Sequence, residues 1–247
     1  PMLQVGAIPI IKRMVISFRQ AGIFPIVIVT GYQEEEIKYQ LSNFGAIFIH
    51  NEAYEAPPLI DSVKLGLSYL QDKCDKVIFS PVNVPMFSPD TLRRMLSVEG
   101  DIITPTYNKQ GGHPVLLSSE VIKDIIEYSG DNGLRGAISS MKEKRVWLPV
   151  DDPGILYSVH NYQQLKEHLE EHNKAILHPN LNITLEKESL FFNSRVKLLM
   201  FLIYDTKHVR KACDQMALSY SKAWDMLNKL EKELGYAVVD RRHGGKH

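Results

Sequence analysis

The chain has 247 residues, of which 44% are hydrophobic, and its 29 Lys and Arg residues balance its 29 Asp and Glu residues. This length accommodates one large and one small globular domain, and the composition excludes a disordered or fibrous protein. The sequence contains neither a long apolar run nor a signal peptide, so we expect a cytoplasmic protein that does not contact a membrane.

The opposite charges are unevenly distributed along the chain. Residues 183–247 hold twelve Lys and Arg against eight Asp and Glu, a net charge of +4, so residues 1–182 carry −4. The basic C-terminal part is a weak indication of contact with a polyanion. Cys74 and Cys213 are far apart and form no C-x-x-C pair, which predicts reduced thiols.

Residues 1–172 alternate short apolar runs with helical patterns, which is typical of βαβ units. Pro9 begins a helix that ends near Gly22. The next elements expected are a strand at 26–30, a helix at 33–41, a strand at 46–50, a helix at 59–70, a strand at 76–80, and a helix beginning at Ser88 or Pro89. Strand 26–30 is continuously apolar, which predicts burial on both faces. These elements predict a doubly wound α/β fold with a mostly parallel sheet.

Ligands of such sheets bind beyond the carboxyl ends of the strands, and the loops there carry distinctive motifs. In chain order these are VTGY, PVNVP, GGHPVLL, GDNGLRG and PVDDPGIL. In this order and spacing, they resemble the MobA/MocA-like molybdenum cofactor nucleotidyltransferases, which join a cytidylyl or guanylyl nucleotide to a pterin. The similarity covers about residues 1–170 and implies a Rossmann-like nucleotidyltransferase domain at 1–172. In that family the first strand and a glycine-rich loop precede the position of Pro1, so we expect both to lie outside this sequence.

The resemblance also implies ligands and the residues that bind them. The ligand is CTP, GTP or a molybdopterin-like molecule, and Ser62 lies in the segment that matches the base-binding region. His113 faces the pterin pocket, or it forms a hydrogen bond with a nearby carbonyl group at the start of a strand. Arg135 contacts a ligand phosphate beside Asp131, or it pairs with Asp131 across the start of a helix.

Two positions where the family has metal-binding carboxylates are substituted. Asn83 stands in PVNVP, and His160 stands after the D-D-P-G turn. Nucleotidyl transfer places charge on phosphate oxygens that Mg²⁺ and cationic side chains neutralise. An amide oxygen brings no charge to Mg²⁺, and imidazole is a poor ligand for it. We therefore expect a degenerate Mg²⁺ site, and we assign no catalytic residue.

Other acidic residues have simpler interpretations. Asp151 and Asp152 precede Pro153 and Gly154, as in a turn. Asp61 is expected to cap the helix that follows it. In the expected helix at 162–172, His168, Glu171 and His172 match the inverted zinc-protease pattern, but we interpret them as a solvated charged face because no third ligand region is evident.

A linker is expected at 173–182 and a second domain at 183–247. Its pattern predicts a core helix at 190–204, a short helix at 207–214, a turn at 215–218, a helix at 219–234, and a strand in YAVVDRR followed by a GGK turn. This is the spacing of a winged helix-turn-helix domain. Through SYSKAWDMLNKLE and RRHGGK, the segment resembles the DNA-binding domain of the molybdate-responsive, ModE-type (LysR-like) repressor.

The second resemblance implies that the chain contacts double-stranded DNA as a homodimer. The residues assigned to DNA are Ser219, Tyr220, Ser221 and Lys222 in the recognition helix, and Arg241, Arg242 and Lys246 in the wing. Trp224 is interpreted as core or dimer packing. The alternative is a basic helical bundle that binds only protein.

Together the two halves predict a DNA-binding regulator linked to molybdenum cofactor metabolism. Its nucleotidyltransferase-like domain binds nucleotide or pterin with little or no turnover. One alternative is an active Mg²⁺-dependent cytidylyl or guanylyl transferase with an accessory DNA-binding domain. A further alternative is a dimerisation tail that has lost DNA binding.

Overall fold

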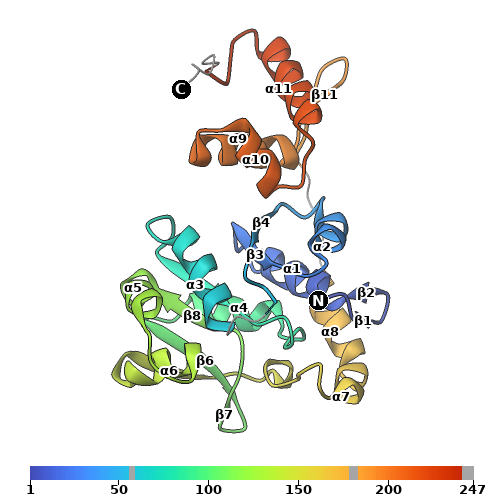
Figure 1. The fold of residues 1–247 in the computed structure, drawn as a ribbon. Coiled ribbons are helices and arrows are strands. Elements are labelled where there is room, and N and C mark those ends of the chain that lie inside the picture. Colours follow the sequence, from blue (N-terminus) through green and yellow to red (C-terminus); the bar gives the residue numbers. More distant parts are fainter. Residues whose placement is uncertain (56–58, 178–182, 241–247) are drawn as a thin grey trace. The chain divides into compact units, whose positions relative to one another are not determined.

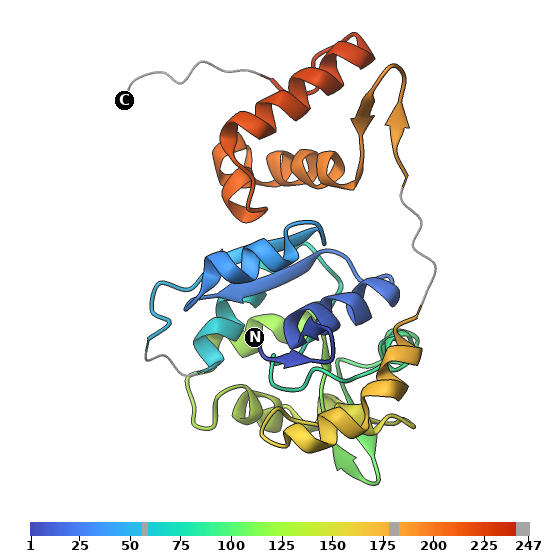
Figure 2. The same cartoon turned by 90° about the vertical axis from the view of Figure 1, so that its right-hand side faces the viewer.

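The computed structural model describes residues 1–55, 59–177 and 183–240, which form two compact units (Figure 1, Figure 2). The first unit comprises residues 1–37 and 49–178, and the second comprises residues 38–48 and 179–247. Arg241, Arg242 and Lys246, assigned to DNA from the sequence, lie outside the described residues. Within the described ranges, every helix is too short or too polar to cross a bilayer.

The first 177 residues alternate strands and helices, and the expected strands at 26–30 and 46–50 and the helix at 59–70 are confirmed. The elements are β1 (Gln4–Val5), β2 (Ile8–Pro9), α1 (Ile10–Gln20), β3 (Ile26–Thr30), α2 (Glu34–Leu41), β4 (Ala46–His50), α3 (Leu59–Leu70), β5 (Lys76–Phe79), α4 (Pro89–Leu96), β6 (Ile102–Tyr107), β7 (Gln110–Gly111), β8 (Val115–Ser118), α5 (Ser119–Glu127), α6 (Gly133–Ser140), β9 (Arg145–Pro149), α7 (Tyr162–Glu167) and α8 (Leu169–Ala175).

The main sheet has the order β5-β8-β6-β7, with β9 beside β6, while β3 and β4 form a separate pair. Strand β8 runs antiparallel to both β5 and β6, and β9 runs parallel to β6. The expectation of a mostly parallel sheet therefore needs one correction: β5, β6 and β9 run in the same direction, while β8 and the short β7 run against them. The reason is the tight turn at Asn108 and Lys109, both with positive φ, which reverses the chain after β6.

Helices cover both faces of this sheet. Ile102 and Leu117 pack into a core cluster with residues of α3, α5 and α6. Their neighbours Ile103 and Leu116 point the other way and pack with residues of α1 and α4. Successive residues of a strand face opposite sides, so the continuous apolar runs of β6 and β8 serve two hydrophobic layers at once. This three-layer arrangement is an α/β fold.

Several local expectations need correction. The expected helix at 162–172 is two helices, because it breaks at His168, and α8 continues to Ala175 into the segment expected to be linker. Asp61 lies in the first turn of α3 and is not its cap. A carboxylate in that turn still interacts favourably with the positive end of the helix dipole.

The C-terminal unit contains β10 (Leu185–Glu186), β11 (Leu190–Phe192), α9 (Ser194–Thr206), α10 (Val209–Gln215) and α11 (Tyr220–Leu234). The first helix of this unit, α9, begins later than the expected residue 190, because β11 pairs with β10 and Asn193 then caps the helix. Ser219 caps α11, and Gly235, with φ of 79°, ends it. The three helices and the turn between α10 and α11 agree with the predicted order.

The expected wing strand is not present in its described part. Residues 236–240 form no strand, and the backbone N–H groups of Val238 and Val239 instead donate to Glu231 Oε1 at 3.0 and 3.2 Å. Trp224 is half-buried and packs edge-on against Tyr220, with ring centroids 6.1 Å apart, so it is not a core residue.

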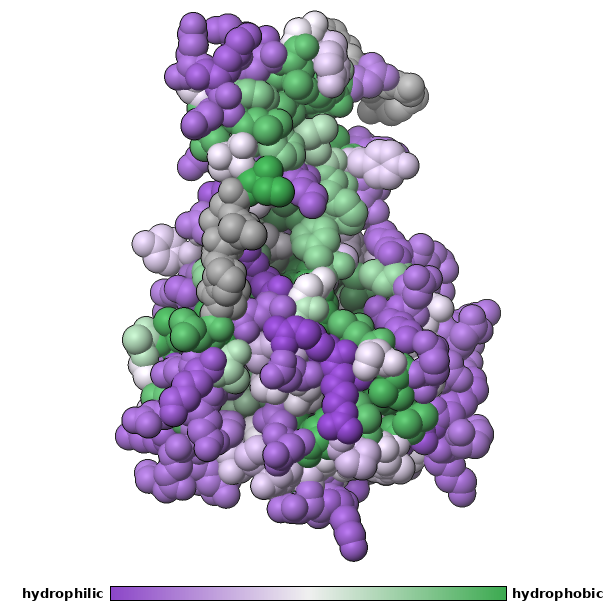
Figure 3. All heavy atoms as spheres, turned by 180° about the vertical axis from the view of Figure 1, so that it is seen from behind, coloured by the Kyte–Doolittle hydropathy of each residue, from purple (hydrophilic) through white to green (hydrophobic). Residues whose placement is uncertain are grey.

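Figure 3 shows one face of the molecule, on which hydrophobic residues are exposed among hydrophilic ones.

Candidate functional site

The two substituted metal positions meet beyond the carboxyl end of β5. The carbonyl oxygen of Asn83 accepts a hydrogen bond from the backbone N–H of Val159 at 2.9 Å, and His160 is the next residue. The Asn83 Oδ1 atom is buried and has no hydrogen-bonding partner in the described part of the chain. His160 is exposed. The fold therefore brings together two positions that the sequence separates by 76 intervening residues.

These side chains do not form a typical magnesium site. Asn83 offers one neutral oxygen, and imidazole suits transition metals better than Mg²⁺. Across residues 1–55, 59–177 and 183–240, no cluster of three or more His, Cys, Asp and Glu side chains could hold a metal ion. Protein sites for Mg²⁺ in phosphate chemistry use one or two carboxylates together with the substrate phosphates. The residues present do not fit that requirement.

His113 lies beside the same end of β5. Its backbone N–H donates to the carbonyl oxygen of Ile155 at 2.9 Å, and its ring packs edge-on against Phe79 at 6.3 Å. A Cβ atom at Gly112 would lie 2.5 Å from the Ile155 carbonyl oxygen, so this close approach requires glycine in the GGHP motif.

The His113 imidazole is held neutral. Its Nδ1 atom is buried without a hydrogen-bonding partner among the described residues. Burial lowers the pKa of His113, and the positive charge of Arg145 lowers it further. A neutral ring with a free nitrogen can form a hydrogen bond with a polar heterocycle.

Arg145, which was not singled out in the sequence, is a half-buried cation in this region. Its Nε donates to Thr104 Oγ1 at 3.0 Å, and its guanidinium lies 3.8 Å from the centre of the Trp147 ring. Burial lowers the pKa of Arg145, and the charge of Arg135 lowers it further, so the two guanidinium groups are close enough to interact. Alternation along β9 places Arg145 and Trp147 on one face, a signal that was available in the sequence.

The remaining predicted ligand residues lie in two places. Arg135 is exposed on α6 and forms no ion pair with Asp131 in the described structure, where Asp131 accepts from Tyr128 Oη through its carbonyl at 2.9 Å. Ser62 lies on α3, and its Oγ accepts a hydrogen bond from Asn51 Nδ2 at 3.0 Å. No hydrogen bond joins Ser62 to His113 or Arg145 among the described residues.

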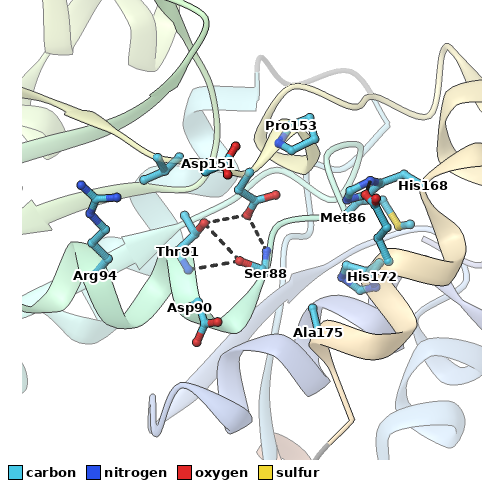
Figure 4. Close-up of a pocket in the computed structure, with 13 residues that line it drawn as sticks. Met86, Ser88, Asp90, Thr91, Arg94, Asp151, Pro153, His168, His172 and Ala175 are labelled. Atoms are coloured by element: carbon cyan, nitrogen blue, oxygen red, sulfur yellow. Dashed lines mark hydrogen bonds and ion pairs between the residues drawn. The ribbon is translucent and has the colours of Figure 1, made fainter.

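A separate cavity of about 380 Å³ lies beside α4 and α8 (Figure 4). Asp152, which is 6% exposed, anchors its wall. Its carboxylate accepts from Ser88 N at 2.8 Å, Thr91 Oγ1 at 2.6 Å and Gly154 N at 3.0 Å. These bonds fix the D-D-P-G turn to the N-terminus of α4, so the role visible for Asp152 is structural.

The H-x-x-E-H residues line this cavity without forming a metal cluster. Glu171 pairs with His168 at 3.0 Å, whereas His172 is only 1% exposed. The expectation of a solvated face is therefore wrong for His172. The buried Arg13 lies beside it, with Nη1 3.4 Å from His172 Nδ1 and 2.8 Å from Asn173 Oδ1. Burial first, and then the Arg13 charge, lowers the pKa of His172 to about 4.

Comparison with known proteins identifies the domain that carries these features. The family model described as a MobA-like NTP transferase domain matches residues 1–146. The chain belongs to this family. The match includes Asn83, His113, Arg135 and Arg145, and it excludes His160.

Two curated proteins resemble parts of the MobA-like domain. The molybdenum cofactor cytidylyltransferase of Escherichia coli is 30% identical over 115 residues, which are 46% of this chain and 58% of that protein. The choline-phosphate cytidylyltransferase of Haemophilus influenzae is 34% identical over 71 residues, which are 29% of this chain and 30% of that protein. The chain thus spans less than two thirds of either relative.

Solved structures support the fold. A nucleotidyl transferase from Methanothermobacter thermautotrophicus has a TM-score of 0.59 at 18% identity, with 69% of this chain and 84% of that chain covered. A 4-diphosphocytidyl-2C-methyl-D-erythritol synthase from Anaerococcus prevotii has a TM-score of 0.55 at 11% identity, with 68% and 88% covered. At these identities the likeness establishes a nucleotidyltransferase α/β fold.

Proposed function

We propose that the MobA-like domain binds CTP, GTP or a molybdopterin-like ligand at the carboxyl end of β5, and transfers the nucleotide weakly or not at all. In this proposal the domain is the ligand-sensing part of a DNA-binding regulator of molybdenum cofactor metabolism. The proposal rests on one observation. The Asn83 carbonyl accepts a hydrogen bond from the backbone N–H of Val159, next to His160, and neither substituted position offers a carboxylate ligand for Mg²⁺.

The cationic residues support binding of a phosphorylated ligand. Arg145 and Arg135 concentrate positive charge near His113. Guanidinium groups bind phosphate through two parallel hydrogen bonds. The neutral His113 ring can then recognise the heterocycle, while Arg135, which is exposed, is accessible to the phosphate. In this proposal, the phosphorylated ligand binds without a protein side chain that coordinates a metal ion.

Binding is tested by isothermal titration of the chain with CTP and with GTP in the absence of divalent metal. We expect Arg145→Gln to weaken nucleotide binding by about tenfold, because a charge-assisted hydrogen bond contributes about 1.5–3 kcal/mol. The matched control is Lys123→Gln, since Lys123 is an exposed cation on α5. Equal affinities for the two variants would remove Arg145 from the site.

The alternative is an active cytidylyl or guanylyl transferase. It is supported by the ordered motifs of residues 1–146 and by the relative named as a molybdenum cofactor cytidylyltransferase. The two possibilities separate in an assay of pyrophosphate release from CTP or GTP with molybdopterin and Mg²⁺. We expect little release from the wild-type chain and more from the Asn83→Asp, His160→Asp double variant. Rapid release by the wild-type chain would establish the transferase.

DNA binding is the second part of the proposed function. Ser219, Tyr220, Ser221 and Lys222 are exposed at the N-terminus of α11, directly after the turn from α10. The Arg210 guanidinium lies 5.4 Å from the centre of the Tyr220 ring and adds positive charge. In helix-turn-helix proteins the N-terminal residues of the second helix contact base edges, and homodimers bind two half-sites.

A gel-shift titration over salt concentration tests the DNA proposal. We expect the affinity to fall steeply with salt and Lys222→Ala to reduce the slope of log affinity against log salt by about 1, the loss of one phosphate contact. Lys229→Ala, an exposed cation further along α11, is the control. Failure to shift a mixed duplex pool at low salt would remove DNA binding and favour the protein-binding bundle or the dimerisation tail.

A further inference from the structure

Trp147 is a large aromatic side chain that is 52% exposed on a strand of the main sheet. Its neighbours in β9, Val146 and Leu148, pack with the core cluster beside α1 and α4. Arg145 and Trp147 alternate with these neighbours and share the face of Ile102, which packs with α6. Tryptophan side chains are highly buried on average, so the exposure of this one is an exception.

The indole ring of Trp147 is held in one orientation. The Arg145 guanidinium lies 3.8 Å from the ring centre, and its Nε donates to Thr104 Oγ1 at 3.0 Å. A Cβ atom at Gly111 would lie 2.5 Å from Trp147 Cζ3 and 3.3 Å from Cη2, so the six-membered ring meets the main chain of β7. Arg145 thus covers one face of the ring and Gly111 one edge. The opposite face is left as the main exposed area.

The surroundings of this ring carry positive charge. Arg145 and Arg135 form no ion pair with a carboxylate within residues 1–55, 59–177 and 183–240. Burial lowers the pKa of Arg145, and the charge of Arg135 lowers it further. Burial and then the charge of Arg145 act in the same way on His113. A bound anion would stabilise these neighbouring guanidinium groups, so an aromatic surface and an anion site lie side by side.

These two features select the chemistry of a ligand. Every heteroaromatic ring has a π-face and gains stacking energy on an exposed indole. A phosphate on the same ligand binds guanidinium groups through paired hydrogen bonds. A quaternary ammonium group is also attracted to an indole face, but here the charge of Arg145 lies on the other side of the same ring and repels it. The site therefore disfavours a cationic headgroup.

We propose that the free face of Trp147 stacks on a planar heteroaromatic ring of the ligand, while Arg145 and Arg135 hold the phosphate of the same molecule. Trp147 is then a specificity-determining residue, which distinguishes heteroaromatic phosphates from the phosphates of sugars and quaternary amines. The phosphate contact in this inference rests on the proposed function. The stacking contact adds the residue that selects the group to which the phosphate is attached.

The test measures, by isothermal titration, the affinity of the 247-residue chain for three phosphates that differ in the attached group. The probes are neopterin monophosphate, ribose 5-phosphate and choline phosphate. We expect neopterin monophosphate to bind about tenfold more tightly than the other two, because it alone can stack. Trp147→Leu should weaken its binding by about tenfold and leave that of ribose 5-phosphate unchanged. Trp147→Phe, which keeps a smaller aromatic face, should retain most of the affinity.

Two further variants separate stacking from a general loss of structure. Gly111→Ala keeps the indole but displaces it, since a Cβ atom there would lie 2.5 Å from Cζ3. We expect it to weaken the binding of neopterin monophosphate alone, by about threefold. Tyr204→Leu is the matched control, because Tyr204 is also an exposed aromatic residue with a cation, the Lys207 ammonium, 3.9 Å from its ring centre. It should leave all three affinities unchanged.

Contact with the indole is observed directly in the fluorescence of the bound pterin, excited at a wavelength that tryptophan does not absorb. The chain contains two tryptophans, so the measurement uses the Trp224→Phe variant, in which Trp147 is the remaining one. We expect the pterin emission to be quenched on binding, because stacking on an indole permits electron transfer. The quenching should disappear when Trp147→Leu is added.

Unchanged affinity for neopterin monophosphate in Trp147→Leu would overturn the proposal, and so would an equal loss for ribose 5-phosphate. Binding of choline phosphate as tight as that of neopterin monophosphate would also overturn it. Failure of the proposed function gives a different result. If Arg145→Gln leaves all three affinities unchanged, the phosphate contact is absent, whereas binding of neopterin without its phosphate that depends on Trp147 would still support stacking.

Discussion

Single residues decide how the proposed nucleotide site and the turns that support it behave. Asn83 and His160 could be identified from the sequence because the motifs that flank them are ordered and spaced distinctively. Arg145 was harder to find, because alternation places it on one face with Trp147 but does not show that it will be half-buried beside Thr104. Its role depends on the pairing of β6 with β9, which is a long-range contact.

Asp152 provides a direct test of the turn that supports α4. Its buried carboxylate accepts three hydrogen bonds, so Asp152→Ala leaves buried donors without partners. We expect the free energy of unfolding in urea to fall by about 3 kcal/mol. Asp151→Ala, at an exposed neighbour, should change it by less than about 0.5 kcal/mol. Similar small losses in both variants would contradict the structural role.

His172 should make stability depend on pH. Its pKa is about 4 in the folded chain, against an ordinary value of 6.5, so the unfolded chain binds the proton more readily. The free energy of unfolding should therefore fall by about 3 kcal/mol as the pH drops from 6.5 to 4, and this contribution should be constant above that window. His113, whose pKa is also lowered, contributes with the same sign.

Urea unfolding at a series of pH values measures this effect. His172→Gln removes the titrating group, and we expect a shallower dependence of stability on pH between 4 and 6.5. The slope that remains reports His113 and other groups. An unchanged slope in the variant would show that His172 is accessible to protons in the folded chain, contrary to its 1% exposure.

At the scale of elements, local sequence signals were sufficient to predict a helix or strand where its ends depend on neighbouring residues. Helix α4 begins after Ser88 as expected, because serine accepts the hydrogen bond from Thr91 N and proline suits the first turn. The mixed sheet could not be predicted, because the antiparallel position of β8 depends on strand pairing. In the described part of the expected wing, residues 236–240 form no strand, and alternation alone did not reveal that Glu231 binds the backbone of Val238 and Val239.

The cap of α9 tests the packing of the C-terminal helices. Asn193 Oδ1 accepts from Arg195 N at 3.0 Å and Val196 N at 3.1 Å. We expect Asn193→Ala to lower the free energy of unfolding of this unit by about 1 kcal/mol, and Asn193→Asp to retain most of it. Circular dichroism during urea unfolding provides the measurement. Equal loss in both variants would indicate that packing, and not the cap, is responsible.

At the scale of the whole molecule, the chain joins a MobA-like domain to a helical unit with an exposed, positively charged helix end. Family membership follows from residues 1–146, and the ordered motifs made it predictable from the sequence. In the proposed function, nucleotide binding by this domain does not depend on protein carboxylates that hold Mg²⁺.

The most direct measurement is the affinity of the chain for CTP and GTP, by isothermal titration, with and without Mg²⁺. We expect Mg²⁺ to change the wild-type affinity by less than about twofold, because Asn83 and His160 bring no negative charge to the ion. In the Asn83→Asp, His160→Asp variant, Mg²⁺ should strengthen binding clearly. A strong dependence of the wild-type affinity on Mg²⁺, abolished by Asn83→Ala, would contradict the account.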